Sequence, residues 1–246
     1  MKKIFTVIAL AAVSFVAMAQ TTGKDVLKDL EGKTVEEKAA PKKAEKEYKL
    51  LDFQVLSHVG YGYHLMDAQE FTQGFKGFNR EFFLNTVELD IWPARWLSLN
   101  LGLDLKWQNI TPAAGNIFQL DTNNDIVYAS TPAGTTGMQS TLHYFSLAVP
   151  LALNFNLGLL GFSAGAELVY TPASRVSIKD SYSIDSSEYK VVTRGCNFNK
   201  LSWDIFATVY AGLTGVYFRY YPQQPLVPTA QFNYMTVGIY FNFTGI

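Results

Sequence analysis

The residue types best suited to catalysis or metal binding are few and widely spaced in this sequence. Its 246 residues hold three histidines, His58, His64 and His143, and a single cysteine, Cys196. None of them forms a zinc motif such as His-Glu-x-x-His, and one thiolate builds neither a metal cage nor an intrachain disulfide. The sequence therefore predicts no metal site and no bound cofactor.

Two catalytic arrangements can be posed from residue types alone. His143 with Ser140 or Ser146 would place a base beside a nucleophile, as in a lipid A deacylase. Glu88 and Asp90 would supply the paired carboxylates of an outer-membrane protease. No third group that would orient His143 is evident, and the two acids share the polar face of one predicted strand. We therefore expect no enzymatic activity, and we expect ion pairing from the acids.

Strands must position these side chains, because apolar and polar residues alternate from Leu50 onward. In the clearest run, 96–107, every odd position is Leu or Trp, whereas the even positions after Trp96 are Ser, Asn, Gly, Asp and Lys. A period of two is typical of a strand with one polar and one apolar face. On the same pattern, Phe83 and Val87 fall on an apolar face opposite Glu88. Eight such strands are predicted, at 51–63, 82–92, 96–107, 141–154, 161–171, 200–210, 215–221 and 231–243.

The connections between these strands alternate in length. Three are tight, at 93–95, 155–160 and 211–214, and four are long and rich in Gly, Pro, Asn, Thr and Ser, at about 64–81, 108–140, 172–199 and 222–230. An up-and-down antiparallel sheet then has its tight turns at one end and its long loops at the other, as transmembrane β-barrels do. Two loops contain further alternation, at 117–120 with 126–128 and at 176–192, which predicts protruding hairpins. Ten strands would result if one of these hairpins entered the wall.

The polar faces are predicted to point inward. An eight-stranded barrel encloses only enough volume for side chains, so charged groups inside it must pair with one another. The interior polar network would comprise Asp52, Glu88, Asp90, Asp104, Lys106, Glu167, Lys200, Asp204 and Arg219. Leu, Val and Phe would face lipid, with an aromatic girdle near the loops from Tyr61, Tyr63, Trp107, Tyr170 and Trp203. The fold class expected is therefore all-β, a closed up-and-down antiparallel transmembrane β-barrel; a lipocalin-like soluble barrel, with the apolar faces inward, is the alternative.

The chain before the barrel divides into two parts. Residues 1–19 combine Lys2 and Lys3, an apolar run, and the signal-peptidase recognition residues Ala17 and Ala19 in Ala-x-Ala spacing, which predicts a cleaved signal peptide. Residues 20–49 mix Lys and Glu with few large apolar groups, which predicts a charged periplasmic linker. The barrel is expected at 50–246.

The last predicted strand carries Thr236, Gly238, Phe241 and Phe243 in the order polar, glycine, aromatic, aromatic. This order resembles the C-terminal β-signal by which the insertion machinery recognises outer-membrane barrels. The stretch 143–153, HYFSLAVPLAL, resembles the fourth-strand pattern of the same barrels. Residues 50–246 as a whole resemble the OmpA/OmpX-like, or porin-family, outer-membrane β-barrel domain.

That resemblance implies a location in the bacterial outer membrane, with outer-membrane lipid and the barrel-insertion machinery as partners. A formal charge of −1 and a pI of about 6.3 argue against nucleic acid. Barrels of this size differ in activity, so the fold does not fix the function. We expect a structural or surface-interaction role carried by the long loops, with a small-solute porin and a lipid-modifying enzyme as alternatives. The sequence identifies neither an extracellular ligand for the loops nor a periplasmic partner for 20–49.

Overall fold

The computed structural model describes residues 50–66, 79–112, 115–222 and 234–243. The predicted signal peptide and linker, with Ala17 and Ala19, lie outside the described residues. Within them, no helix is both long enough and apolar enough to span a membrane. The strands are β1 (Leu51–Val55), β2 (His58–Met66), β3 (Arg80–Ala94), β4 (Leu97–Ile110), β5 (Asn116–Leu120), β6 (Ile126–Ser130), β7 (Thr136–Leu157), β8 (Leu160–Tyr170), β9 (Val176–Ile184), β10 (Ser187–Arg194), β11 (Leu201–Ala211), β12 (Thr214–Tyr221) and β13 (Tyr234–Asn242), with a short 3-10 helix at Ala173–Arg175.

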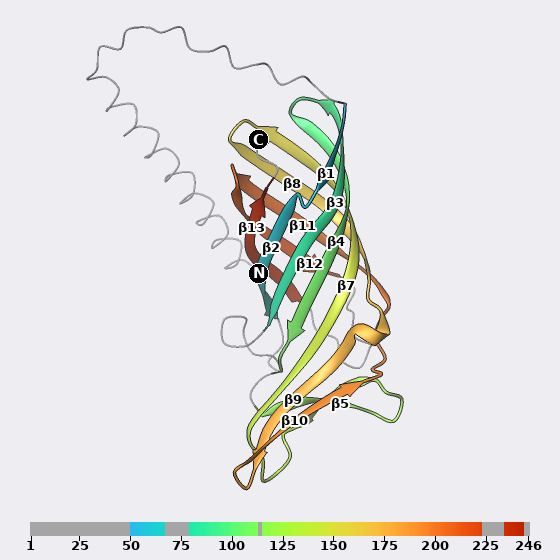
Figure 1. The fold of residues 1–246 in the computed structure, drawn as a ribbon, viewed down its shortest axis with the longest axis vertical. Coiled ribbons are helices and arrows are strands. Elements are labelled where there is room, and N and C mark those ends of the chain that lie inside the picture. The colour runs from blue at the N-terminus through green and yellow to red at the C-terminus, as the bar shows by residue number, and fades with distance from the viewer. Residues whose placement is uncertain (1–49, 67–78, 113–114, 223–233, 244–246) are drawn as a thin grey trace, which may run out of the picture. The chain divides into compact units, whose positions relative to one another are not determined.

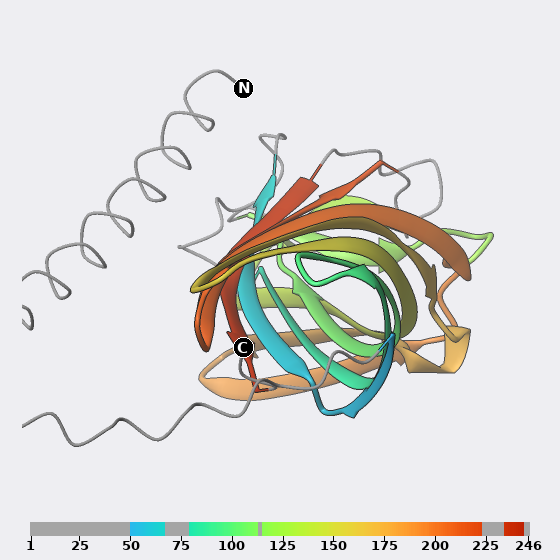
Figure 2. The ribbon, with the colours of Figure 1, turned by 90° about the horizontal axis from the view of Figure 1, so that it is seen from above.

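Eight of these strands form a closed ring, visible from above in Figure 2. The order is β2-β3-β4-β7-β8-β11-β12-β13, every pair is antiparallel, and β13 returns to pair with β2 from Tyr234 opposite Met66 to Asn242 opposite His58. The predicted all-β, up-and-down barrel of eight strands is therefore confirmed. Both predicted loop hairpins lie outside the ring, so the ten-strand alternative does not apply.

The two ends of the barrel differ as expected. Tight turns join β3 to β4, β7 to β8 and β11 to β12 at one end. At the other end β7 continues past the ring and pairs with β9, which pairs with β10, so a three-stranded sheet projects from the wall (Figure 1). The hairpin β5–β6 forms a separate two-stranded sheet at this end. The hairpins expected at 117–128 and 176–192 are thus both present.

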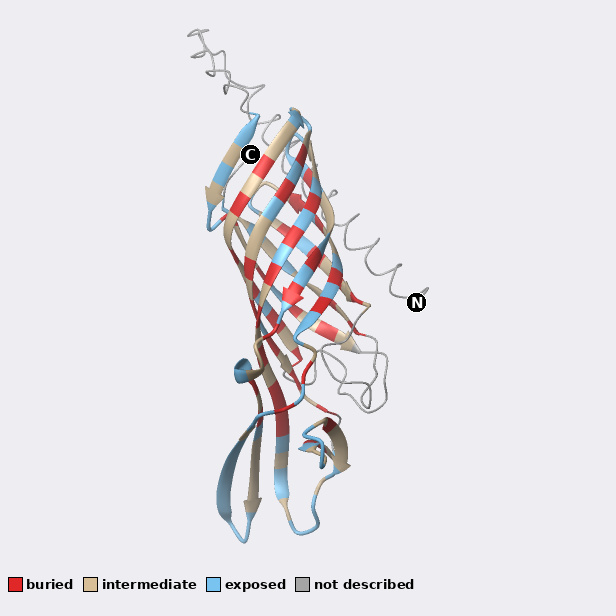
Figure 3. Ribbon diagram, turned by 90° about the vertical axis from the view of Figure 1, so that its right-hand side faces the viewer, coloured by how far each residue is buried: buried red, intermediate tan, exposed pale blue. Residues whose placement is uncertain are grey.

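The barrel is apolar outside and polar inside. Along β4, Leu99, Leu101 and Trp107 are exposed, whereas polar residues between them, such as Asn100 and Lys106, are buried. Figure 3 shows the same alternating bands on neighbouring strands. A soluble barrel has the opposite polarity, so the lipocalin-like alternative is wrong. From Trp96 to Trp107 the wall rises about 28 Å, for about 3.3 Å per residue and a tilt near 40°. This height is close to the roughly 25 Å apolar band of outer-membrane barrels.

A β-bulge changes which residues of β3 face the lumen. The register of β3 against β4 shifts between Asn85 and Val87, and opposite this point Leu56 interrupts the predicted strand 51–63 with a φ of 55°. Before the bulge the odd residues of β3 point inward, and after it the even ones do. Phe83, predicted to face outward, is therefore buried in the lumen at 3% exposure. The extra residue in the bulge reverses the alternation on which the prediction rested.

Candidate functional site

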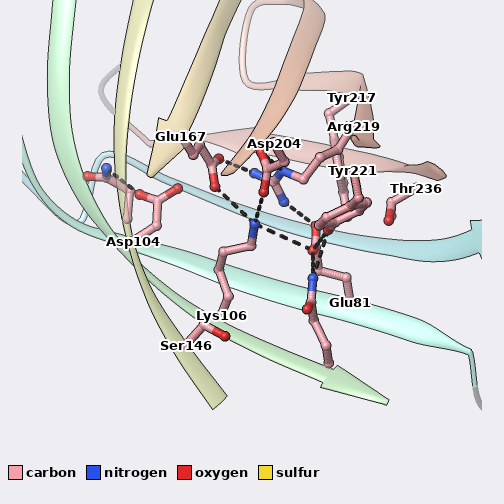
Figure 4. Close-up of polar contacts among 12 residues, drawn as sticks. Glu81, Asp104, Lys106, Ser146, Glu167, Asp204, Tyr217, Arg219, Tyr221 and Thr236 are labelled. Atoms are coloured by element: carbon pink, nitrogen blue, oxygen red, sulfur yellow. Dashed lines mark hydrogen bonds and ion pairs between the residues drawn. The ribbon is translucent and has the colours of Figure 1, made fainter. Parts of the chain in front are cut away.

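Five charged side chains meet in the middle of the lumen, each from a different strand (Figure 4). Two are cations and three are carboxylates, and all are buried: Glu81 of β3, Lys106 of β4, Glu167 of β8, Asp204 of β11 and Arg219 of β12. They meet because period-two alternation turns the polar residue of each strand inward at the same height. We call this group the lumen cluster.

The two cations of the lumen cluster bridge its three carboxylates. Lys106 Nζ lies 2.7 Å from Asp204 Oδ2, 2.9 Å from Glu167 Oε2 and 3.8 Å from Glu81 Oε2. The Arg219 guanidinium pairs with Glu81 and Glu167 through its two terminal nitrogens, and its Nε lies 3.3 Å from Asp204 Oδ1. Buried charges are tolerated only when they are paired and hydrogen-bonded, and each carboxylate here meets both cations.

Neutral groups complete the coordination of Glu81. Tyr221 and Gln108 donate to its Oε2, and Tyr217 donates to its Oε1 at 3.3 Å. The Phe83 ring lies 4.7 Å from the Arg219 guanidinium carbon, in cation–π geometry. The lumen cluster is thus a packed plug that cross-links five strands.

The lumen between the cluster and the tight turns is acidic and rich in amides. Asp90 accepts hydrogen bonds from Ser98, Asn100, Gln54 and Asn154 at 3.2–3.4 Å. Asp52 accepts one from Gln54 at 2.9 Å, and Asp104 accepts one from Asn85 at 2.8 Å. Amides rather than cations satisfy these carboxylates.

Ser57, His58 and Glu88 lie together at the start of β2, but not as a catalytic triad. His58 Nδ1 lies 2.8 Å from Ser57 Oγ and 3.1 Å from Glu88 Oε2, and Ser57 also hydrogen-bonds Glu88. A triad needs the serine on one imidazole nitrogen and the acid on the other. Both partners lie near the same nitrogen here, so this group lacks the geometry of a triad.

The structure separates the predicted interior network into three groups. Lys106, Glu167, Asp204 and Arg219 meet in the lumen cluster, whereas Asp52, Glu88, Asp90 and Asp104 lie nearer the tight turns. Lys200 was expected inside but is exposed, because it precedes β11 and its carbonyl accepts the backbone N–H of Thr171.

Sequence reasoning missed one of the three acids of the lumen cluster, Glu81. It falls one residue before the predicted start of the strand at 82, and the bulge hides its inward phase. Tyr217 and Tyr221 were also missed, although they share the parity of Arg219 in 215–221, and that parity could have identified them.

The serine–histidine pairs posed from the sequence are not assembled. His143 Nδ1 contacts the side-chain amide of Asn109 at 2.6 Å, Ser146 shares a hydrogen bond with Thr171, and the Ser140 hydroxyl accepts the Phe118 amide. Among the described residues no group of three His, Cys, Asp or Glu side chains is placed to hold a metal ion.

An apolar cluster lies on the long-loop side of the barrel. It is formed by the hairpin β5–β6, the inner face of β7 and β9, the ends of β4, β12 and β13, and the segment after β10: Ile110, Phe118, Ile126, Leu142, Tyr144, Val176, Ile178, Cys196, Phe198, Tyr221 and Tyr234. A bridge between Asp125 and Asn197 joins the hairpin to that last segment. We call this cluster the apolar cap. Burial in it raises the pKa of the Cys196 thiol.

The projecting sheet ends in an exposed strand. Nearly every residue of β10 is exposed, and within the described residues β10 pairs only with β9. Tyr189 stacks on Tyr182 at 5.5 Å, and Tyr189 and Val191 are 45% and 42% exposed on the same face. A free strand edge with apolar side chains is a template for pairing with another chain.

The predicted β-signal residues lie on both faces of β13. Thr236 is buried and hydrogen-bonds His64 at 2.8 Å, whereas Phe241 and Phe243 are 40% and 59% exposed toward the lipid side. A Cβ on Gly238 would lie 2.4 Å from the Tyr217 ring. Gly238 therefore makes room for a lumen tyrosine.

Comparison with known proteins returned structural resemblance only. No protein-family model and no curated protein matches the sequence. Among solved structures, Ail, the attachment invasion locus protein of Yersinia pestis, aligns at 10% identity over 78% of this chain and 97% of its own, with a TM-score of 0.31. A mutant Rh. blastica porin aligns at 8% identity over 78% of this chain and 100% of its own, with a TM-score of 0.21.

Proposed function

We propose that this protein is an integral outer-membrane barrel with a closed lumen, whose work is done by the sheet that it holds above the membrane. The observation that carries the proposal is the pairing of two features: a lumen filled by buried ion pairs, and a projecting strand with a free edge. A barrel that conducts solute needs the reverse arrangement, an open lumen.

The closed lumen is supported at two heights. The lumen cluster fills the middle of the barrel with side chains from five strands, and the apolar cap covers the long-loop end. A solute would have to displace Arg219 from its carboxylates and Phe118 from the cap. This weighs against the porin alternative, and the separated Ser140, Ser146 and His143 weigh against a lipid-modifying enzyme.

Strand addition at β10 is the interaction mode that we propose for the projecting sheet. An extended peptide that adds to a sheet edge gains main-chain hydrogen bonds and uses side-chain pockets for specificity. Tyr189 and Val191 supply apolar contacts beside that edge. The partner is therefore expected to present an extended segment with apolar residues at every second position.

Membrane topology is the first test. Ser186, in the β9–β10 turn, and Leu159, in the β7–β8 turn, are each exposed and are replaced by cysteine one at a time in a Cys196→Ser background. On intact cells a membrane-impermeant maleimide should label S186C and not L159C. Labelling of both or neither, or a protein that is absent from the outer-membrane fraction, would contradict the proposal.

The interaction role is tested separately, with cells that display the barrel on their surface. Tyr189→Lys with Val191→Lys should reduce adhesion of these cells to one another or to host cells, because charged edge strands resist pairing. Asp121→Lys with Asn123→Lys, in the β5–β6 turn, places the same added lysines away from that edge. Equal adhesion by both variants would argue against a role for β10.

A further inference from the structure

The outward face of the barrel carries an aromatic row just below the projecting sheet. It is defined by register across four neighbouring strands: Tyr61 of β2, Phe82 of β3, Trp107 of β4 and Phe145 of β7. The Phe82 and Trp107 rings lie 5.5 Å apart, and the Trp107 and Phe145 rings 5.1 Å. Aromatic residues in this position mark the boundary between lipid tails and headgroups.

A polar row lies one step above the aromatic row, on the same face. Two residues along a strand correspond to about 6.6 Å. Cross-strand partners run from the barrel wall into the projecting sheet: Tyr63, Arg80, Asn109, His143, Ser177 and Arg194. The next row holds Thr141, Lys179 and Val192. Neither row contains a carboxylate.

Two of the cations in these rows are available on the surface. Lys179 and Arg194 are exposed, and neither takes part in an ion pair within the described part of the chain. Asp180, which follows Lys179 in sequence, belongs to the opposite face of β9 by alternation. Lys190, two steps above Arg194 on β10, is paired with Glu188 at 3.2 Å.

His143 is subject to both burial and positive charge. Burial, with a contribution from the nearby cations Lys179 and Arg80, lowers its pKa to about 4. The imidazole is therefore neutral at physiological pH. The His143 ring contacts the side-chain amide of Asn109, and that amide also lies beside Arg80. These contacts hold the three side chains together on the outer face of the barrel.

We propose that Lys179 and Arg194 bind the phosphate groups of outer-leaflet lipid headgroups, at a site on the outer face of the projecting sheet. The inference rests on the proposed outer-membrane location. The occupant follows from position and charge: the site stands at headgroup height above the aromatic row, it is cationic, and it faces the lipid. Arginine and lysine are the side chains that proteins use for phosphate.

Lipid selectivity tests this site. The mature chain is refolded into vesicles of phosphatidylcholine with bisphosphorylated lipid A, and the lipids retained on the extracted barrel are counted by native mass spectrometry. Wild-type protein should retain lipid A in preference to phosphatidylcholine. Lys179→Gln and Arg194→Gln should each reduce this preference about fivefold, the factor expected for one cation near an anionic surface.

Two matched controls make the result specific. Lys190→Gln removes the same charge from the same sheet, farther from the aromatic row, and should retain the wild-type preference. Lipid A without its phosphates should show no preference. Equal preference in all four proteins, or retention of dephosphorylated lipid A, would overturn the site. A heat-modifiability gel of each sample shows whether the barrel inserted, so failure of the membrane proposal is seen separately.

Discussion

Arg219 shows how strongly single side chains are constrained in this barrel. Its guanidinium pairs with carboxylates from three other strands, and it is 1% exposed. Removing one partner of a buried ion pair leaves the remaining charges without compensation, which typically costs about 3–5 kcal/mol. Arg175, by contrast, is exposed in the short 3-10 helix.

Arg219→Leu should therefore lower the free energy of unfolding by about 3–5 kcal/mol. Arg175→Leu should change it by no more than about 0.5 kcal/mol, as surface substitutions usually do. Urea titration of the refolded barrel, read by heat-modifiability on gels, measures both. Coincident unfolding curves for Arg219→Leu and wild type would show that the lumen cluster does not stabilise the fold.

Gly238 also allows close packing between β13, β2 and a lumen side chain, apart from its place in the predicted β-signal. A Cβ there would lie 2.3 Å from the Tyr61 carbonyl oxygen as well as against the Tyr217 ring. Gly238→Ala should destabilise the barrel by about 1–3 kcal/mol, as overpacking does. Refolding into detergent without any insertion machinery isolates this effect. Ile239→Ala, on the neighbouring exposed position, is the control, and an unimpaired Gly238→Ala barrel would leave recognition as the role of this glycine.

At the scale of elements, we expect the β5–β6 hairpin to cover the long-loop end of the barrel as a lid. Phe118 and Ile126 of the hairpin are each 1% exposed in the apolar cap, where Cys196 is also buried. The raised pKa of Cys196 keeps its sulfur as the unreactive thiol at neutral pH. The rate at which the Cys196 thiol is alkylated therefore measures how far the hairpin shields the apolar cap.

Cys196 in the folded barrel should react with iodoacetamide much more slowly than in urea. Phe118→Ala should increase the native rate, because the hairpin loses its main contact with the cap. Labelling is followed by mass spectrometry over time. Leu120→Ala, at the margin of the cap, should have a smaller effect, and equally rapid alkylation of native and unfolded wild-type protein would refute a closed lid.

The elements were predictable where alternation is uninterrupted. Strands β4, β8 and β11 follow the period of two, and each turns its charged residues inward as predicted. The bulge in β3 could not be foreseen, because neither Gly nor Pro marks the residues at 85–87, and its effect reached Phe83 and Glu81. Lys200 was misplaced for a different reason: alternation gives the phase of a strand but not the residue at which it starts.

At the scale of the whole molecule, the proposed closure of the lumen at two heights predicts that solutes do not pass through the barrel. The lumen cluster and the apolar cap share no residue, although Tyr221 of the apolar cap donates a hydrogen bond to Glu81 of the lumen cluster. Opening one of them leaves the other in place. The barrel is consequently expected to conduct no ions while it holds the projecting sheet at the membrane surface.

Single-channel recordings in planar bilayers should show no reproducible conductance steps for the wild type. Deleting 115–131, the segment of the β5–β6 hairpin, should also give none, because the lumen cluster persists. Discrete steps in the wild type would restore the porin alternative. Steps in the deletion alone would show that the lumen cluster does not block ions.

The pairing of β13 with β2 closes the ring, and it joins the two ring strands that are farthest apart in sequence. His64 and Thr236, hydrogen-bonded across it, are 172 residues apart. Every other neighbouring pair of the ring joins strands that follow one another in the ring order along the chain, but this pair requires both the first and the last strand of the ring. A prematurely terminated polypeptide would keep the edge of β2 unsatisfied in hydrocarbon, where each unpaired backbone group is costly. Closure of the ring therefore requires both β2 and β13, the first and last strands of the ring.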